Sequence, residues 1–254
     1  MDQRIIASTN ISVSPLGLGT VKFGRNESVK YPEGFELPSD EQIVELLTLA
    51  QHLGINMLDT APAYGLSETR LGRLMPGKRS DWVIIGKAGE EFRDGQSYFD
   101  FTAARVEMSV ERSLERLNTN YLDALLLHSD GRDVEILSDD ILIQKLHDLK
   151  TQGLVKAIGA STKTVEGGKM ALDLLDTAMV TYNPEHTEEL PVLDYALEQG
   201  KSVLLKKVFS SGHNASPEEC LKLALSHPAV ASAIVGTINP KHLTDNVTAA
   251  KNLL

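Results

Sequence analysis

The stretch INMLD at residues 55–59 is a short apolar run that ends on an acid. Two later runs have the same form: VIIGK at 83–87 ends on a lysine, and LDALLLH at 122–128 ends on a histidine. Each run has a length typical of a strand. An ionisable side chain therefore closes each of three candidate strands, and this regularity favours a fold that gathers strand ends together.

The residues that close these runs are Asp59, Lys87 and His128, and Tyr64 follows the first of them in the turn APAYG. If the runs are neighbouring parallel strands, they lie about 4.8 Å apart and their last residues share one edge of the sheet. Each residue alone has a simpler explanation, such as a turn cap, a solvated lysine or a packed aromatic. Their coincidence instead indicates convergence at one point, where the four side chains could carry proton chemistry.

Short apolar runs recur along the whole chain. They lie at residues 16–22, 55–59, 83–87, 122–128, 156–161, 179–183, 202–207 and 231–237. Runs that are apolar on both faces are typical of parallel strands covered by helices. Eight strand–helix units in about 250 residues predict a (β/α)8 TIM barrel. No linker or low-complexity tract divides the chain, so we expect residues 1–254 to form a single barrel domain.

The segments between the runs carry helix signals. Ser39 and Gln42 form a capping-box pair ahead of an apolar stripe, and Gly54 is placed to stop that helix. Further helix starts are expected at Thr102, Pro217 and Pro240. Strands that alternate with helices in this way support the barrel.

The first residues, RIIASTNISVS, alternate polar and apolar around a Thr-Asn turn. They predict a short N-terminal β-hairpin that could plug the N-terminal end of the barrel. A doubly wound sheet is the main alternative, and it would place a glycine-rich phosphate turn after its first strand. Gly17, Gly19 and Gly24 have the wrong spacing for that turn, and no helix pattern follows them directly. We therefore favour the barrel.

The composition narrows the class of protein. The chain has 254 residues, 42% of them hydrophobic, and no apolar run approaches the roughly 20 residues that cross a bilayer. No basic flank followed by an apolar stretch opens the sequence, so we expect no signal peptide, no membrane partner and a cytoplasmic protein. Cys220 is the only cysteine, which excludes an internal disulfide and a cysteine cluster for zinc.

The net charge of the chain also limits which classes of ligand and partner are expected. An excess of ten acidic charges argues against a general nucleic-acid binder, because phosphate contact needs clustered Lys and Arg. It is compatible with a small anionic ligand held by one basic residue and a few backbone donors. No long apolar stripe demands a protein partner, so we expect a monomer.

The four convergent residues fit a proton-transfer device. A free tyrosine titrates near pH 10, and a neighbouring ammonium lowers its pKa, so we expect Lys87 to lower the pKa of Tyr64. Asp59 would hold the lysine, and His128 would orient a carbonyl oxygen. Because no side chain supplies hydride, such chemistry would require a nicotinamide cofactor.

Several motifs together resemble those of the aldo-keto reductase superfamily over nearly the whole chain. They are LGLGT (16–20), LDTAPAYGLSETRLG (58–72), the strand-final Lys87, LLLHSD around His128, and GLVKAIGAS (153–161). The resemblance implies a (β/α)8 barrel and NAD(P)H-dependent reduction of aldehydes or ketones, or the reverse oxidation of an alcohol or sugar. It also implies a catalytic tetrad of Asp59, Tyr64, Lys87 and His128.

The resemblance further implies where the nicotinamide end of the cofactor would bind. Thr20 matches a position that touches the nicotinamide, and Ser161 matches the serine that holds its carboxamide. Thr162, Met179 and Lys206 stand where the family usually has asparagine, glutamine and a stacking aromatic, so this part of the site departs from the pattern.

The lysine pair after the seventh run has two interpretations. Lys206 or Lys207 could contact the ribose or the pyrophosphate, with residues 209–214, beginning at Phe209, as the neighbouring loop. A solvated lysine pair at a strand end is the alternative.

The last strand and helix resemble the family's adenosine-phosphate site. Gly236 and Thr237 would meet the 2′-phosphate at a helix N-terminus, where free backbone N–H groups favour anions. His242 stands where an arginine often grips that phosphate, and Asp245 and Asn246 match the pair that contacts adenine. A neutral imidazole holds a phosphate less firmly than arginine. We expect NADP(H), with NAD(H) as the alternative.

Two other functions compete with a carbonyl or alcohol oxidoreductase. A metal-dependent hydrolase on the same barrel would carry a His-x-His pair on an early strand, and the first run has no histidine, so we expect no metal site. A cofactor-binding sensor or regulatory barrel with little turnover would keep the fold without the activity. The loop at residues 25–38 could cover part of the substrate pocket or lie free in solvent.

Overall fold

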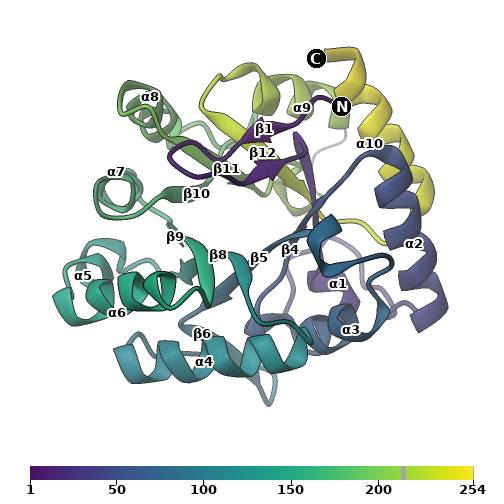
Figure 1. Cartoon of the computed structure of the whole chain (residues 1–254). Coiled ribbons are helices and arrows are strands. Elements are labelled where there is room, and N and C mark those ends of the chain that lie inside the picture. Colours follow the sequence, from purple (N-terminus) through teal and green to yellow (C-terminus); the bar gives the residue numbers. More distant parts are fainter. Residues whose placement is uncertain (213–215, 254) are drawn as a thin grey trace.

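The computed structural model describes residues 1–212 and 216–253. Its centre is a closed barrel of eight parallel strands, which confirms the expected (β/α)8 fold (Figure 1). The strands are β3 (Leu16–Gly19), β4 (Met57–Asp59), β5 (Val83–Ala88), β8 (Leu122–His128), β9 (Val155–Ser161), β10 (Thr177–Thr181), β11 (Ser202–Lys206) and β12 (Val230–Val235). Each of the eight apolar runs overlaps one of them. Strands that follow one another along the chain are neighbours, for example β9 and β10, and the barrel closes where the last strand, β12, pairs with the first, β3.

Helices surround the barrel (Figure 1). The α-helices are α1 (Val21–Gly24), α2 (Asp40–Leu53), α3 (Ser67–Leu74), α4 (Ala103–Arg116), α5 (Asp133–Leu137), α6 (Asp140–Thr151), α7 (Val165–Leu174), α8 (Leu190–Glu198), α9 (Pro217–Ser226) and α10 (Pro240–Leu253). Short 3-10 turns are η1 (Pro62–Tyr64), η2 (Arg79–Asp81) and η3 (Ser210–Gly212). No helix in the described part of the chain is long and apolar enough to cross a membrane.

The sequence signals explain where α2 begins and ends. The Ser39 hydroxyl accepts from the Gln42 amide, and the Gln42 side chain accepts from the Ser39 amide, so the predicted capping box is confirmed. Gly54 adopts φ 88° directly after the helix, a left-handed conformation that glycine reaches without a Cβ penalty. The apolar face that lies between these caps packs against the barrel.

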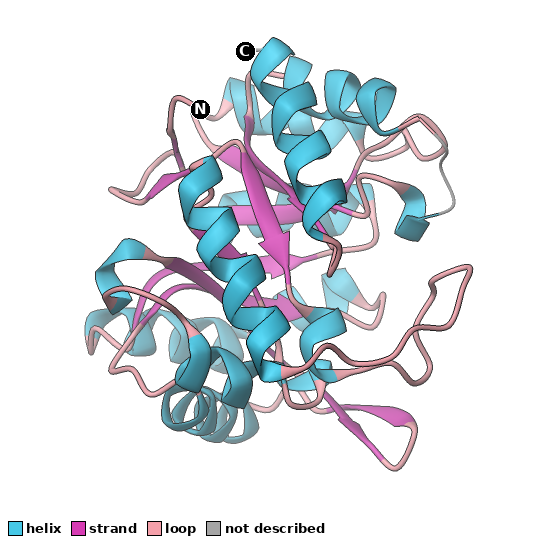
Figure 2. Cartoon of the chain, turned by 90° about the vertical axis from the view of Figure 1, so that its right-hand side faces the viewer, coloured by secondary structure: helices cyan, strands magenta, loops and turns pink. Residues whose placement is uncertain are grey.

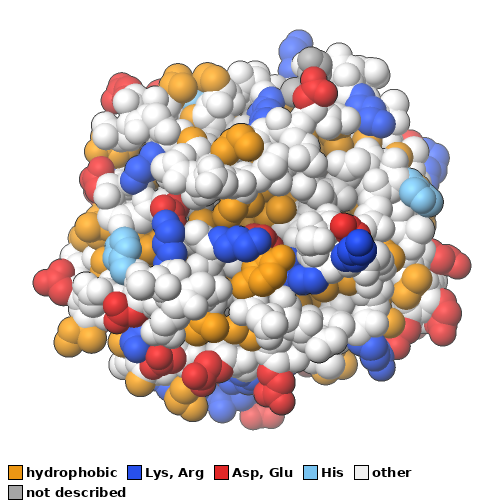
Figure 3. Space-filling view, in the orientation of Figure 1, with side chains coloured by type: hydrophobic (Ala, Val, Ile, Leu, Met, Phe, Trp, Pro, Cys, Tyr) orange, Lys and Arg blue, Asp and Glu red, His pale blue; other side chains and the backbone are white. Residues whose placement is uncertain are grey.

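A small apolar core fills the inside of the barrel, separate from the larger core between strands and helices. Strand side chains such as Leu126, Met179 and Leu204 form this inner core together with Ile6 and Val13 of the N-terminal segment. That segment is the predicted hairpin, in which β1 (Arg4–Ile5) pairs antiparallel with β2 (Ser12–Val13). The hairpin therefore plugs the N-terminal end of the barrel. Figure 3 shows this face, where acidic, basic and apolar side chains are interspersed.

The opposite end of the barrel carries the longer connections. A second hairpin, β6 (Glu90–Arg93) with β7 (Gln96–Phe99), follows β5 and was not predicted from the sequence. The hairpin and the loop at residues 25–38 project from the same end of the molecule (Figure 2). Ser28 donates to the carbonyl of Gly95 at 3.0 Å, so the two projections contact each other. They form one wall beside the strand ends.

Gly24 and Gly65 bring two backbone segments together beneath that wall. A Cβ on Gly24 would lie 2.4 Å from the carbonyl oxygen of Tyr64 and 2.1 Å from the amide of Ser67. A Cβ on Gly65 would lie 2.2 Å from the carbonyl oxygen of Gly24. The turn that carries Tyr64 therefore packs backbone to backbone against the end of α1.

We expect Gly24→Ala to destabilise the protein by about 1–3 kcal/mol, because the methyl group meets backbone atoms that cannot move aside. Gly34→Ala, in the loop that follows α1, is the matched control, since nothing lies within 4 Å of its Cβ position. Its effect should stay within about 0.5 kcal/mol. Urea unfolding measures both variants, and equal midpoints would contradict the close approach.

Candidate active site

Four side chains converge where the barrel strands end. Asp59 ends β4, Lys87 lies near the end of β5, His128 ends β8, and Tyr64 enters from η1. All four line one cavity of about 240 Å³ at this end of the barrel. The structure thus brings together the residues that the strand ends predicted, because parallel strands present their carboxyl ends on one side.

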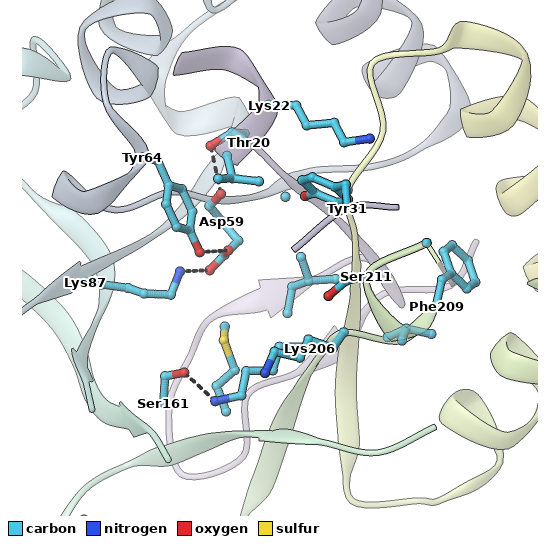
Figure 4. A pocket seen from close by; sticks show the side chains of 18 of the residues that line it. Thr20, Lys22, Tyr31, Asp59, Tyr64, Lys87, Ser161, Lys206, Phe209 and Ser211 are labelled. Carbon is cyan, nitrogen blue, oxygen red and sulfur yellow. Dashed lines mark hydrogen bonds and ion pairs between the residues drawn. The ribbon is translucent and has the colours of Figure 1, made fainter. Parts of the chain in front are cut away.

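Asp59 is the centre of this group (Figure 4). Its Oδ1 atom pairs with the Lys87 ammonium, and both side chains are almost fully buried. Its Oδ2 atom accepts from the Tyr64 hydroxyl at 3.3 Å. Lys87 donates a second hydrogen bond to the carbonyl of Thr60 at 3.2 Å. The carboxylate therefore holds both the amine and the phenol in place.

The pKa of Tyr64 shifts in the opposite direction to the expected one. Lys87 Nζ lies 4.9 Å from the centroid of the Tyr64 ring, but the lysine is paired with Asp59. Desolvation in the cavity raises the pKa of Tyr64 well above its ordinary value, and the negative charges of Asp59 and Glu90 raise it further. The expected lowering of this pKa by Lys87 is therefore wrong for the protein without ligand. The phenol is neutral and can donate a proton.

His128 has a partner that the sequence did not indicate. Its Nδ1 atom lies 2.7 Å from Oε2 of Glu90, the first residue of the unpredicted hairpin. Desolvation lowers the pKa of His128, and the nearby ammonium groups of Lys87 and Lys206 lower it further, while Glu90 opposes them. The only available signal was the position of Glu90 shortly after the strand-final Lys87, and it was too weak to predict the contact.

Residues expected at the nicotinamide, at the ribose or pyrophosphate and at the 2′-phosphate lie around the same cavity. Its lining includes Thr20, Ser161, Lys206, Lys207, Phe209 and Gly236. Thr20 is fixed by two hydrogen bonds, from its amide and its hydroxyl, to the carbonyl of Asp59 at 3.0 and 2.8 Å. Thr162 differs: it is fully buried and does not line the cavity, although its carbonyl accepts from Lys206 at 2.6 Å.

Lys206 occupies the space beside Ser161 (Figure 4). Its ammonium donates to the Ser161 hydroxyl at 2.9 Å, and Met179 lies in the same cavity wall. Desolvation at the mouth of the barrel lowers the pKa of Lys206 to about 7. Lys207 also reaches the cavity and adopts φ 54°, a strained conformation for a residue with a Cβ. Asn214, expected to end the neighbouring loop, falls outside the described residues.

A second, larger cavity of about 690 Å³ continues from the first. Its lining contains the residues expected at the adenosine end, Thr237, His242, Asp245 and Asn246, with Gly236 shared between the two cavities. Asp245 is paired with Lys241 at 2.6 Å, and His242 is exposed on the first turn of α10. The two ends of the expected cofactor site thus adjoin each other.

Tyr31 and Lys22 lie at the junction of the two cavities, and the sequence did not single out either of them. The Lys22 ammonium lies 4.0 Å from the centroid of the Tyr31 ring. Tyr31 belongs to the loop at residues 25–38, so this loop lines both cavities rather than lying free in solvent. Within the described residues, no group of His, Cys, Asp and Glu is arranged to hold a metal ion.

Known proteins are similar to this chain in sequence and in architecture. The model of the Aldo/keto reductase family matches residues 15–212. L-galactose dehydrogenase of Arabidopsis thaliana is 28% identical over 100% of this chain and 89% of its own length. D-threo-aldose 1-dehydrogenase of a Pseudomonas species is 29% identical over 84% of this chain and 70% of its length.

Solved structures agree with these sequence matches. The crystal structure of a Pseudomonas aeruginosa protein assigned to the aldo-keto reductases is 49% identical, with a TM-score of 0.91 over 99% of this chain and 94% of that one. The holo form of an aldo-keto reductase from Bacillus halodurans has the same fold, with a TM-score of 0.82 at 23% identity over 99% and 91% of the two chains. The chain therefore belongs to the aldo/keto reductase family, whose members are oxidoreductases that generally use nicotinamide cofactors.

Proposed function

We propose that the protein interconverts a small carbonyl compound and its alcohol by hydride transfer, using NADP(H). The observation that carries this proposal is the contact of Tyr64, Lys87 and Asp59 inside one cavity, beside a second cavity lined by the expected adenosine contacts. The first cavity supplies proton-transfer groups, and the second supplies room for a dinucleotide next to them.

The residues present fit a nicotinamide dinucleotide. Ser161 and Lys206 offer hydrogen-bond donors at one end, and Thr237 with Asn246 offers polar groups at the other. Lys22 and Lys207 line the space between and bring positive charge to a chain that is acidic overall. When bound, the cofactor would accept or supply the hydride that no side chain can provide.

Tyr64 is the proton donor to the carbonyl oxygen in this proposal. Its raised pKa keeps the phenol protonated through neutral pH, so an acid is present when the oxygen gains charge. The buried ion pair between Asp59 and Lys87 holds the phenol at the cavity wall and places an ammonium 4.9 Å from its ring, where it stabilises the phenolate left after transfer.

The names of relatives support a hydroxylated substrate. L-galactose dehydrogenase and D-threo-aldose 1-dehydrogenase are named for sugar oxidation. D-arabinose 1-dehydrogenase of Saccharomyces cerevisiae is 36% identical over 59% of this chain and 43% of its own length. We propose a small polyhydroxylated aldehyde or its cyclic form as the substrate class, with oxidation as a physiological direction beside reduction.

Tyr64→Phe tests the proton donor. We expect kcat for carbonyl reduction to fall at least about 10²-fold, the usual size of an acid–base contribution, while the Kd of NADPH stays unchanged. Tyr98→Phe is the control, because Tyr98 is an exposed residue of β7 outside the cavity. Steady-state kinetics and fluorescence titration of the cofactor measure the two effects. An unchanged kcat in Tyr64→Phe would remove Tyr64 from this role.

His242→Arg tests the choice of cofactor. A guanidinium in place of the exposed imidazole adds charged hydrogen bonds to a 2′-phosphate, so we expect the KM of NADPH to fall about tenfold or more, with little change for NADH. Comparison of kcat/KM for the two cofactors in both proteins measures this. Equal changes for NADPH and NADH would place the 2′-phosphate elsewhere.

A further inference from the structure

The cavity that holds Tyr64 has an excess of positive charge in its wall. Four lysines line it: Lys22, Lys87, Lys206 and Lys207. Among the described residues, the one carboxylate in the lining is that of Asp59, and it is already paired with Lys87. The other three ammonium groups therefore have no carboxylate in the lining to neutralise them.

Lys206 brings its charge to the cavity wall at Ser161 (Figure 4). Lys206 ends β11, and β10 lies between β11 and β9 in the barrel. The side chain therefore reaches past the end of β10 to the end of β9. There its ammonium donates to the Ser161 hydroxyl at 2.9 Å and to the Thr162 carbonyl at 2.6 Å. Both acceptors are neutral, so neither cancels the charge.

The charge state of Lys206 changes close to neutral pH. Desolvation, with the positive charges of Lys207 and Lys87, lowers its pKa to about 7, and the negative charges of Glu189 and Asp133 oppose that shift. Neither of these two carboxylates lines the cavity, so they leave its inner face positive. Lys206 is therefore mainly an ammonium below pH 7.

The nicotinamide ring of the proposed cofactor has to share this cavity. In the proposed function, Tyr64 gives its proton to the carbonyl oxygen, and the hydride goes to the carbon bonded to that oxygen, about 1.2 Å away. A cavity of about 240 Å³ leaves little room between that carbon and the wall at Ser161 and Lys206. A ring in position to transfer hydride therefore lies near the Lys206 ammonium.

The nicotinamide ring changes its charge when hydride is transferred. The oxidised ring is a cation and the reduced ring is neutral, whereas the phosphates and the adenosine are the same in both forms. An ammonium near the ring therefore repels only the oxidised form. At separations of about 4–8 Å and an effective dielectric constant of about 20, this repulsion corresponds to at least about a tenfold difference in binding.

We propose that Lys206 selects the redox state of the cofactor: its ammonium disfavours the cationic ring, so the protein binds NADPH more tightly than NADP⁺. After a carbonyl has been reduced, the same repulsion favours the release of NADP⁺. This inference rests on the proposed function and adds a specificity-determining residue to it. Charged Lys206 biases the site towards reduction, and neutral Lys206 removes that bias.

Lys206→Met tests the inference, because methionine keeps most of the length of the side chain and removes its charge. We expect the ratio of the Kd of NADP⁺ to the Kd of NADPH at about pH 6 to fall at least about tenfold, mainly through tighter binding of NADP⁺. Lys206→Arg keeps a positive charge and should keep the high ratio. Isothermal titration calorimetry measures both Kd values without turnover.

Lys22→Met is the matched control. Lys22 also lines the cavity, but it lies at the junction with the second, larger cavity, with its ammonium 4.0 Å from the centroid of the Tyr31 ring. We expect Lys22 to attract the phosphates, which both cofactor forms share. Its loss should weaken both forms and change the ratio less than about twofold. A change as large as that of Lys206→Met would overturn the assignment to Lys206.

The pH dependence of the ratio checks the role of the charge. In the unaltered protein the ratio should fall as the pH rises from about 6 to about 9, because the ammonium that repels NADP⁺ loses its proton. The ratio in Lys206→Met should be nearly independent of pH. This variant retains the other charged or titratable groups that act at this position, which are Lys87, His128, Asp133, Glu189 and Lys207. An equal fall in the variant would assign the effect to one of them and overturn the proposal.

Equal Kd values for NADP⁺ and NADPH in the unaltered protein at about pH 6 would also overturn the proposal. So would a high ratio that Lys206→Met leaves unchanged, and in that case the proposed function would still stand because both forms bind. Failure of the unaltered protein to bind either form would contradict the proposed function and this inference together.

Discussion

The buried ion pair between Asp59 and Lys87 is the interaction on which the site depends. Both charges are buried at the mouth of the barrel, away from water. Removal of one partner would leave the other charge buried and unpaired, which would reduce the free energy of unfolding by about 3–5 kcal/mol. Asp59 also accepts from the Tyr64 hydroxyl, and its carbonyl accepts from Thr20. Three strand ends and one turn are therefore tied to a single residue, so the geometry of the cavity follows from that pair.

The same pair leaves the phenol in its neutral form. A lysine that is already satisfied by a carboxylate stabilises a phenolate less than a free ammonium does, and the carboxylate itself repels a second negative charge. Tyr64 is thus ready to give a proton before any ligand arrives. The pKa of His128 shifts in the opposite direction, because desolvation lowers it. The two proton-bearing groups respond to pH through different neighbours.

Local charge at the cavity contrasts with the charge of the whole chain. The protein carries an excess of ten acidic charges, yet Lys22, Lys87, Lys206 and Lys207 line one cavity. Desolvation, with the positive charges of Lys207 and Lys87, lowers the pKa of Lys206 to about 7. An anionic dinucleotide would relieve that repulsion, which is why the basic cluster and the adjoining cavity are best understood together.

The sequence by itself determined the barrel, the hairpin plug and the meeting of Asp59, Lys87 and His128, because apolar runs on a repeating period specify parallel strands and such strands end on one side. Only the tertiary structure decided what those residues do to one another. The contact of Glu90 with His128, the raised pKa of Tyr64 and the burial of Thr162 outside the cavity depend on how a hairpin folds back and how far water is excluded. The spacing of residues along the chain predicts the strand on which a side chain lies. It does not predict the distance from that side chain to its neighbours in space, or the dielectric constant around it.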